Sequence, residues 1–229
     1  MSKNMPVKDI RTLGFVLRRT NVGEADRILN LITPQGKLSV MAKGARREKS
    51  KLAGGIEVFT LSDFNIHFSK SEIGTLTGAK MVKHYSNLMR EFDKMELAGF
   101  FLKRINLLAE QSDSEEFFEI LKQSLEGLND GMDSGLVQAW FLLNTVRASG
   151  EEINFHRDKD GEKLRAGANY AWDVYESAFF ETPKGEFGTD EIKVLRLMIS
   201  SKLGIIGRVK MDDVNYGEIL RLAKIISKF

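Results

Sequence analysis

Residues 25–42, ADRILNLITPQGKLSVMA, contain two apolar segments joined by a turn. Residues 25–33 are rich in Ile and Leu, whereas residues 37–42 alternate apolar and polar side chains. Residues 34–36 between them, Pro-Gln-Gly, are of the types that connect antiparallel strands. Because successive side chains of a strand point to opposite faces, the alternation indicates a strand with one buried face. This stretch predicts two paired strands.

Three further strands are predicted on either side of this pair. Residues 10–19 precede it, and residues 56–68 and 71–79 follow it. In residues 56–68, the side chains Phe64, Ile66 and Phe68 alternate with polar neighbours, which points them toward an interior. Five short strands in about 70 residues favour a small closed barrel.

The hydrophobic period changes near residue 86, where apolar residues begin to recur at spacings of three and four, as in an amphipathic helix. More helices are predicted over residues 114–128, 134–149, 189–201 and 212–227. Residues 150–188 are rich in Gly and charge and contain an aromatic island: Tyr170, Trp172, Tyr175, Phe179 and Phe180. The predicted class is α+β, with a five-stranded barrel at residues 1–80 and a helical domain at residues 81–229.

Composition excludes several chemistries. The chain has no cysteine, so disulfides, thiolate metal sites and thiol catalysis are ruled out. No apolar run approaches the ~18–20 residues that span a bilayer, and the first residues lack the apolar core of a signal peptide. A cytoplasmic protein is expected.

Charge is divided unevenly along the chain. Residues 1–80 hold 14 Lys and Arg against 7 Asp and Glu, whereas residues 81–229 hold 20 against 25. The overall net charge of +2 therefore hides a basic first third and an acidic remainder. Such asymmetry suggests that the first third faces a polyanion.

The basic charge concentrates in residues 40–55, VMAKGARREKSKLAGG. Its cations, with Glu48 as the only acid, are Lys43, Arg46, Arg47, Lys49 and Lys51. Lys and Arg neutralise phosphates, and the Arg fork also stacks on bases, so the predicted loop is a candidate nucleic-acid site. The alternative is a solvated loop that aids solubility. Secondary candidates at strand ends are Lys37, Arg18 and Arg19, with ordinary surface charge as their alternative.

Other motifs favour structural roles. Phe15, Phe59, Phe64 and Phe68 are available for base stacking, but core packing is the stronger interpretation. Residues 23–27, GEADR, offer two carboxylates beside an Arg, yet a turn in which an acid pairs with a nearby Arg explains them better than catalysis. The three histidines are far apart and lack metal-ligand spacing. No metal site is predicted.

Four short motifs in fixed order carry a resemblance to a family: GFVL at 14–17, GEADRI at 23–28, GKL at 36–38 and AKGARR at 42–47. Together they resemble the bacterial recombination mediator RecO family. The resemblance implies an N-terminal OB-fold barrel and a helical C-terminal domain. It also implies binding of single- and double-stranded DNA, strand annealing, and cooperation with RecR in loading RecA, in a cytoplasmic, nucleoid-associated protein. No catalytic residue and no cofactor are expected.

The resemblance further implies contact with the acidic, Phe-ended tail of the single-strand DNA-binding protein. Lys103, Arg104 and Arg147 are candidates to receive its carboxylates. One departure concerns metal: many members carry four cysteines as a zinc site, whereas residues 150–188 here hold only His156 as a classical soft ligand. We expect packing of the aromatic island to replace that zinc site. Two alternatives remain open, an adaptor that binds only proteins and a metal-dependent nucleic-acid enzyme.

Overall fold

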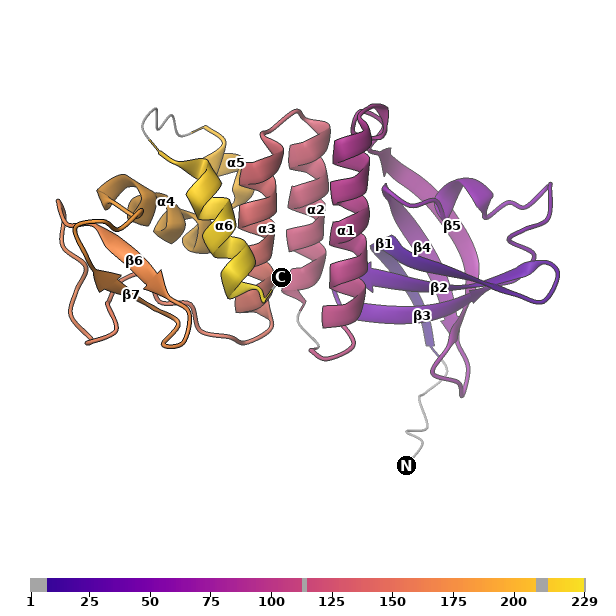
Figure 1. Cartoon of the computed structure of the whole chain (residues 1–229). Coiled ribbons are helices and arrows are strands. Elements are labelled where there is room, and N and C mark those ends of the chain that lie inside the picture. Colours follow the sequence, from indigo (N-terminus) through magenta and orange to yellow (C-terminus); the bar gives the residue numbers. More distant parts are fainter. Residues whose placement is uncertain (1–7, 113–114, 209–213, 229) are drawn as a thin grey trace. The chain divides into compact units, whose positions relative to one another are not determined.

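The computed structural model describes residues 8–112, 115–208 and 214–228, and Figure 1 shows its elements. The chain forms two compact units, Met1–Leu125 and Glu126–Phe229, which are described separately. The last strand of the first unit ends at His84, and helical structure follows. The domain division at residues 80 and 81 stays a prediction.

Five strands of the first unit form a closed barrel in the order β1-β2-β3-β5-β4. They are β1 (Lys8–Val22), β2 (Asp26–Thr33), β3 (Gly36–Ala42), β4 (Thr60–Phe68) and β5 (Gly74–His84). Neighbouring strands are antiparallel except β3 and β5, which pair in parallel. This is the five-stranded OB-fold barrel, and the predicted α+β class is confirmed.

Strand alternation explains the barrel core. Leu29 and Leu31 of β2, Val40 of β3, and Phe64 and Ile66 of β4 are almost fully buried in one cluster. Their neighbours along each strand point outward, because the side-chain period of a strand is two. The interior position predicted for Phe64 and Ile66 is therefore confirmed.

The largest differences from the sequence prediction are at the ends of two strands. β4 begins at Thr60 rather than at residue 56, because a short 3-10 turn, η1 (Ala53–Gly55), and Phe59 with φ of 57° precede it. β5 continues to His84, beyond the predicted end at residue 79. Both differences lie in residues outside the alternating apolar positions on which the strand prediction was based.

Helical elements follow the barrel. A second 3-10 turn, η2 (Leu88–Arg90), precedes α1 (Phe92–Leu108), so the helix starts later than residue 86. α2 (Glu116–Asn129) follows, and the first residue of its predicted range, 114, lies outside the described residues. α1 is tied to the barrel by a hydrogen bond of 3.1 Å from Asn30 Nδ2 to Asn106 Oδ1.

The second unit contains α3 (Ser134–Ala148), β6 (Tyr170–Asp173), β7 (Ala178–Glu181), α4 (Thr189–Ser200), α5 (Leu203–Ile206) and α6 (Tyr216–Ile226). α3 contacts both α4 and α6 (Figure 1). The start of the helix predicted at 212–227 falls outside the described residues. The β6–β7 pair and α5 are additions to the helical prediction, since four-residue elements are too short to show a period.

The aromatic island forms a packed cluster in this unit. Phe179 contacts Trp172, Tyr170 and Phe187 at ring-centroid distances of 5.0, 6.3 and 5.4 Å. Phe155, from outside the predicted island, contacts Trp172 at 6.1 Å. Tyr175 is 99% exposed and is therefore no part of the cluster.

Candidate nucleic-acid interface

The basic loop, residues 43–51, connects β3 to η1 on the barrel. All five of its cations are exposed: Lys43, Arg46, Arg47, Lys49 and Lys51. Ala45 lies between them and is 5% exposed, and Leu52 packs against the barrel core. The backbone is therefore fastened to the barrel while the charged side chains face solvent.

Hydrogen bonds to the β1–β2 turn fix the start of this loop. Gly44 N–H donates to Asp26 Oδ1 at 2.7 Å, and Arg46 N–H donates to the Ala25 carbonyl at 2.9 Å. Arg46 Nη1 also donates to the Gly23 carbonyl at 3.1 Å. The turn expected at residues 23–27 is confirmed, but the expected pair of an acid with an Arg is not found among the described residues, because Asp26 accepts from a backbone amide.

The end of the loop is fixed by close packing. A Cβ on Gly55 would lie 2.6 Å from the Ala79 carbonyl carbon of β5. No side chain larger than hydrogen fits this contact without movement, so the glycine permits η1 to lie directly on β5. No sequence pattern indicated this pairing.

The loop cations remain available for a ligand. None of the five forms an ion pair with a carboxylate in the part of the chain that the structure describes. An exposed guanidinium or ammonium group without a carboxylate partner keeps its full attraction for a phosphate. The loop therefore offers five charges on an anchored backbone.

The three secondary candidates lie in different surroundings. Lys37 Nζ contacts Glu110 Oε1 at 2.8 Å and donates to the Asn106 carbonyl at 3.0 Å, and its side chain is 13% exposed. These contacts tie β3 to the end of α1 and favour a structural role for Lys37. Arg19 pairs with Glu57 at 2.7 Å, and Arg18 lines a groove beside α1.

Lys37 also changes the pKa of its partner, Glu110. The hydrogen bond from Lys37 lowers the pKa of Glu110 below its ordinary value, with Coulombic attraction by Lys37 and Arg18 adding to the effect. Arg11 similarly lowers the pKa of Asp63 through a hydrogen bond of 2.9 Å. Both carboxylates stay charged at neutral pH and neutralise the cations beside them.

The aromatic candidates are mostly core residues. Phe64 and Phe68 belong to the barrel cluster, as predicted. Phe15 is 1% exposed and contacts Tyr85 at 6.0 Å and Phe118 at 5.7 Å. Phe59 also lies inward but borders a groove.

The histidines and carboxylates form no metal site among the described residues. His67 Nδ1 lies 2.7 Å from Asp9 Oδ1, and His84 and His156 are exposed. Of the residues proposed to receive an acidic peptide tail, Lys103 is exposed on α1 and Arg147 is exposed on α3, in the other unit.

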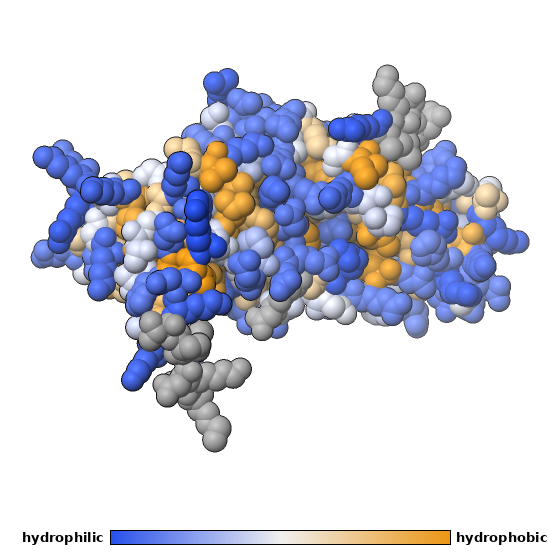
Figure 2. Space-filling model, turned by 180° about the vertical axis from the view of Figure 1, so that it is seen from behind, coloured by the Kyte–Doolittle hydropathy of each residue, from blue (hydrophilic) through white to orange (hydrophobic). Residues whose placement is uncertain are grey.

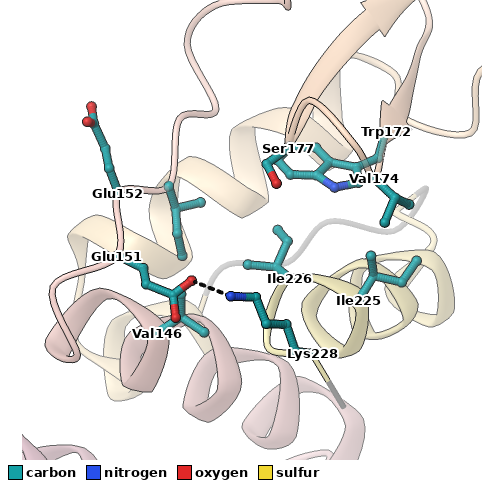
Figure 3. A pocket seen from close by; sticks show the side chains of 10 residues that line it. Val146, Glu151, Glu152, Trp172, Val174, Ser177, Ile225, Ile226 and Lys228 are labelled. Atoms are coloured by element: carbon teal, nitrogen blue, oxygen red, sulfur yellow. Dashed lines mark ion pairs between the residues drawn. The ribbon is translucent and has the colours of Figure 1, made fainter. Parts of the chain in front are cut away.

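Cavities elsewhere are less suited to a polyanion. One cavity of about 630 Å³ lies beside the start of β1 and is lined by Lys8, Arg11, Lys37 and Glu72 among others. Arg11 and Lys37 are held by carboxylates there. Figure 3 shows a pocket of about 220 Å³ in the second unit, where Lys228 and Glu151 form an ion pair at 3.5 Å.

The face drawn in Figure 2 gives no stronger evidence for a binding site. On the face drawn in Figure 2 most of the surface is hydrophilic, and apolar residues form separate patches. No helix within the described ranges is long and apolar enough to cross a membrane. The basic loop is thus the strongest candidate site.

The barrel topology and the cationic loop define an OB-fold protein with a basic surface. Residues 5–85 match the family model described as Recombination protein O N terminal. Among curated relatives, the DNA repair protein RecO of Dehalococcoides mccartyi (strain CBDB1) is 31% identical over 170 residues, which is 71% of this chain and 65% of the relative.

The DNA repair protein RecO of Bacillus cytotoxicus is 27% identical over 210 residues, covering 87% of this chain and 83% of the relative. RecO of Roseiflexus sp. is 29% identical over 141 residues, covering 61% and 50%. Residues 5–85 belong to the family of the RecO N-terminal model, and the resemblance of the chain to RecO proteins is confirmed. The chain spans about 65% of the length of the first of these relatives.

Proposed function

We propose that this chain is a non-catalytic DNA-binding protein of recombinational repair. It binds single and double strands through the basic loop and promotes annealing of complementary strands. The proposal rests on one observation above others: five exposed cations on a loop whose backbone is fixed to an OB barrel. The resemblance to RecO proteins, which are named DNA repair proteins, supports it.

The mechanism is charge neutralisation. Two DNA strands repel each other because every phosphate carries a negative charge, and bound Lys and Arg displace the counterions that otherwise screen them. A fixed cationic loop lowers this repulsion where two strands meet. Contacts to the phosphate backbone of DNA carry no sequence information, so the chain is expected to bind DNA of any sequence.

The remaining steps of the proposed function involve protein partners. Residues 81–229 hold 20 basic and 25 acidic residues and form the acidic remainder of the chain. We assign the contacts with RecR and with the single-strand DNA-binding protein to surfaces outside the basic loop. In this proposal the chain delivers strands to RecA with RecR and catalyses no bond change itself.

Fluorescence anisotropy of a labelled single strand over a salt series tests the DNA-binding step. Five phosphate contacts predict a log–log slope of roughly −3.5 for a single strand and −4.5 for a duplex. The test variant replaces Arg46, Arg47, Lys49 and Lys51 with Ala. A control of equal charge replaces four exposed lysines of the other unit, Lys163, Lys184, Lys202 and Lys224, with Ala.

The loop variant should lose most of the salt-dependent affinity, and the control should keep it. Equal binding by both variants would move the site away from the loop. Absent binding by the unmodified chain would favour an adaptor that binds only proteins, and magnesium-dependent cleavage of the labelled strand would favour an enzyme.

A further inference from the structure

A groove between the barrel and α1 lies beside the segment that leads from the basic loop into β4. Its volume is about 390 Å³, within the range of roughly 300–1,000 Å³ that is common for ligand pockets. Leu17, Phe59 and Leu102 form an apolar lining, and each is less than 9% exposed. The groove lies within a single compact unit.

Phe59 holds a strained backbone at this groove. Its φ is 57°, a region that bulky L-residues seldom occupy. The Tyr85 N–H donates to the Phe59 carbonyl at 3.2 Å and helps to hold the conformation. Strain of this kind occurs preferentially at ligand-binding and catalytic sites, where the surrounding structure enforces it.

Gly99 keeps the groove open. It lies inside α1, where glycine is less favourable than alanine. A Cβ at this position would meet no atom within 4 Å, so packing does not require a glycine. The missing side chain instead leaves space in the wall of the groove, which Gly99 lines.

The charged residues that line the groove are both cations. They are Arg18 of β1 and Lys103 of α1, and both are exposed. Neither takes part in an ion pair with a carboxylate of the described chain, although Arg18 lies near enough to Glu110 to influence it. An apolar floor with a cationic rim matches a nucleotide, whose base is flat and apolar on its faces and whose phosphate is anionic.

We propose that this groove receives a nucleobase of a single strand, with the adjoining phosphates held by Arg18 and Lys103. The inference rests on the proposed DNA binding and extends it, because it places α1 in the site and makes part of the affinity depend on bases. Duplex DNA, whose bases are stacked inside, cannot use the groove without unpairing.

The test compares two labelled single strands of equal length, one of thymidines and one of abasic sites, on the full chain. Gly99→Leu fills the groove, and Gly99→Ala is its matched control in the same helix. Lys103→Ala removes the rim charge, and Lys224→Ala, an exposed lysine of α6, is the control for it. Circular dichroism melting checks that each variant is folded.

We expect the unmodified chain and Gly99→Ala to prefer the thymidine strand by roughly fivefold or more, the lower end of base–aromatic stacking. Gly99→Leu should lose that preference while its binding of the abasic strand is unchanged. Lys103→Ala should reduce the salt slope by about 0.7 on the single strand. If Gly99→Leu does not fold, the Lys103→Ala result decides.

Two results would overturn the inference. In the first, the thymidine and abasic strands bind equally well to every variant while the loop variant of residues 46–51 still loses binding, so that the proposed function stands and only the groove fails. In the second, a labelled acidic peptide with an apolar end binds the unmodified chain but not Gly99→Leu, and strand binding is unaffected. The groove would then be a peptide site.

Discussion

Asp26 accepts a hydrogen bond from the backbone N–H of Gly44 at 2.7 Å, which joins the β1–β2 turn to the start of the basic loop. Gly44 has a positive φ of 65°, a conformation that glycine adopts without steric cost. A single half-buried carboxylate thus helps to position a loop that carries five exposed cations.

Asp26→Ala should lower the free energy of unfolding by about 1–2 kcal/mol, since a hydrogen bond to a charged acceptor is lost and the Gly44 amide is left without its partner. Urea denaturation measures the change. Glu24 is exposed and lies two positions before Asp26, so Glu24→Ala is the matched control and should have little effect. Equal stabilities of the two variants would show that the Asp26 contact is not needed.

Gly55→Ala should destabilise the barrel by about 1–3 kcal/mol, because the new Cβ would overlap the backbone of Ala79. Gly54→Ala is the control, since a Cβ there meets no atom within 4 Å. Thermal melts of both variants distinguish the positions. A Gly55→Ala chain as stable as Gly54→Ala would contradict the close approach of η1 to β5.

Trp172→Ala should lower the melting temperature, because it removes the ring that contacts Phe155 and Phe179. The expected loss is about 2–4 kcal/mol, slightly less than for a fully buried aromatic residue. Tyr175 is exposed and lies between β6 and β7, so Tyr175→Ala should leave the melting temperature unchanged. An unchanged melting temperature for Trp172→Ala would count against the cluster as a substitute for a zinc site.

Glu110 gives the first unit a pH dependence. Lys37 lowers the pKa of Glu110 in the folded chain, so the folded state favours the charged carboxylate. The resulting stabilisation is present above the unfolded pKa of about 4.3 and is lost as pH falls through the lower folded pKa. Glu110→Gln should therefore lower the urea midpoint slightly at pH 7, and this effect should diminish as the pH falls below about 4.3.

The matched control for this substitution is Glu96→Gln, an exposed position on α1. It should leave the midpoint unchanged at every pH. A Glu110→Gln effect that does not diminish as the pH falls would show that the residue acts through packing and not through its charge.

The sequence by itself determined the strands, most of the helices and the position of the basic loop. Alternation in β3 and β4 and three- to four-residue spacing in α1 are local properties, because each element buries one face whatever its neighbours are. The charge cluster at residues 43–51 was visible for the same reason: its members are close in sequence. The ordered motifs also indicated the RecO family.

Only the tertiary structure decided which residues meet. Lys37 contacts Glu110, Gly55 lies on Ala79, and Arg18 and Lys103 line one groove. These partners are distant in sequence, and the hydrophobic periodicity within one element does not indicate which distant residues it meets in space. Barrel closure and the packing of α1 bring them together, and that packing turned Lys37 from a candidate ligand contact into a link between β3 and α1.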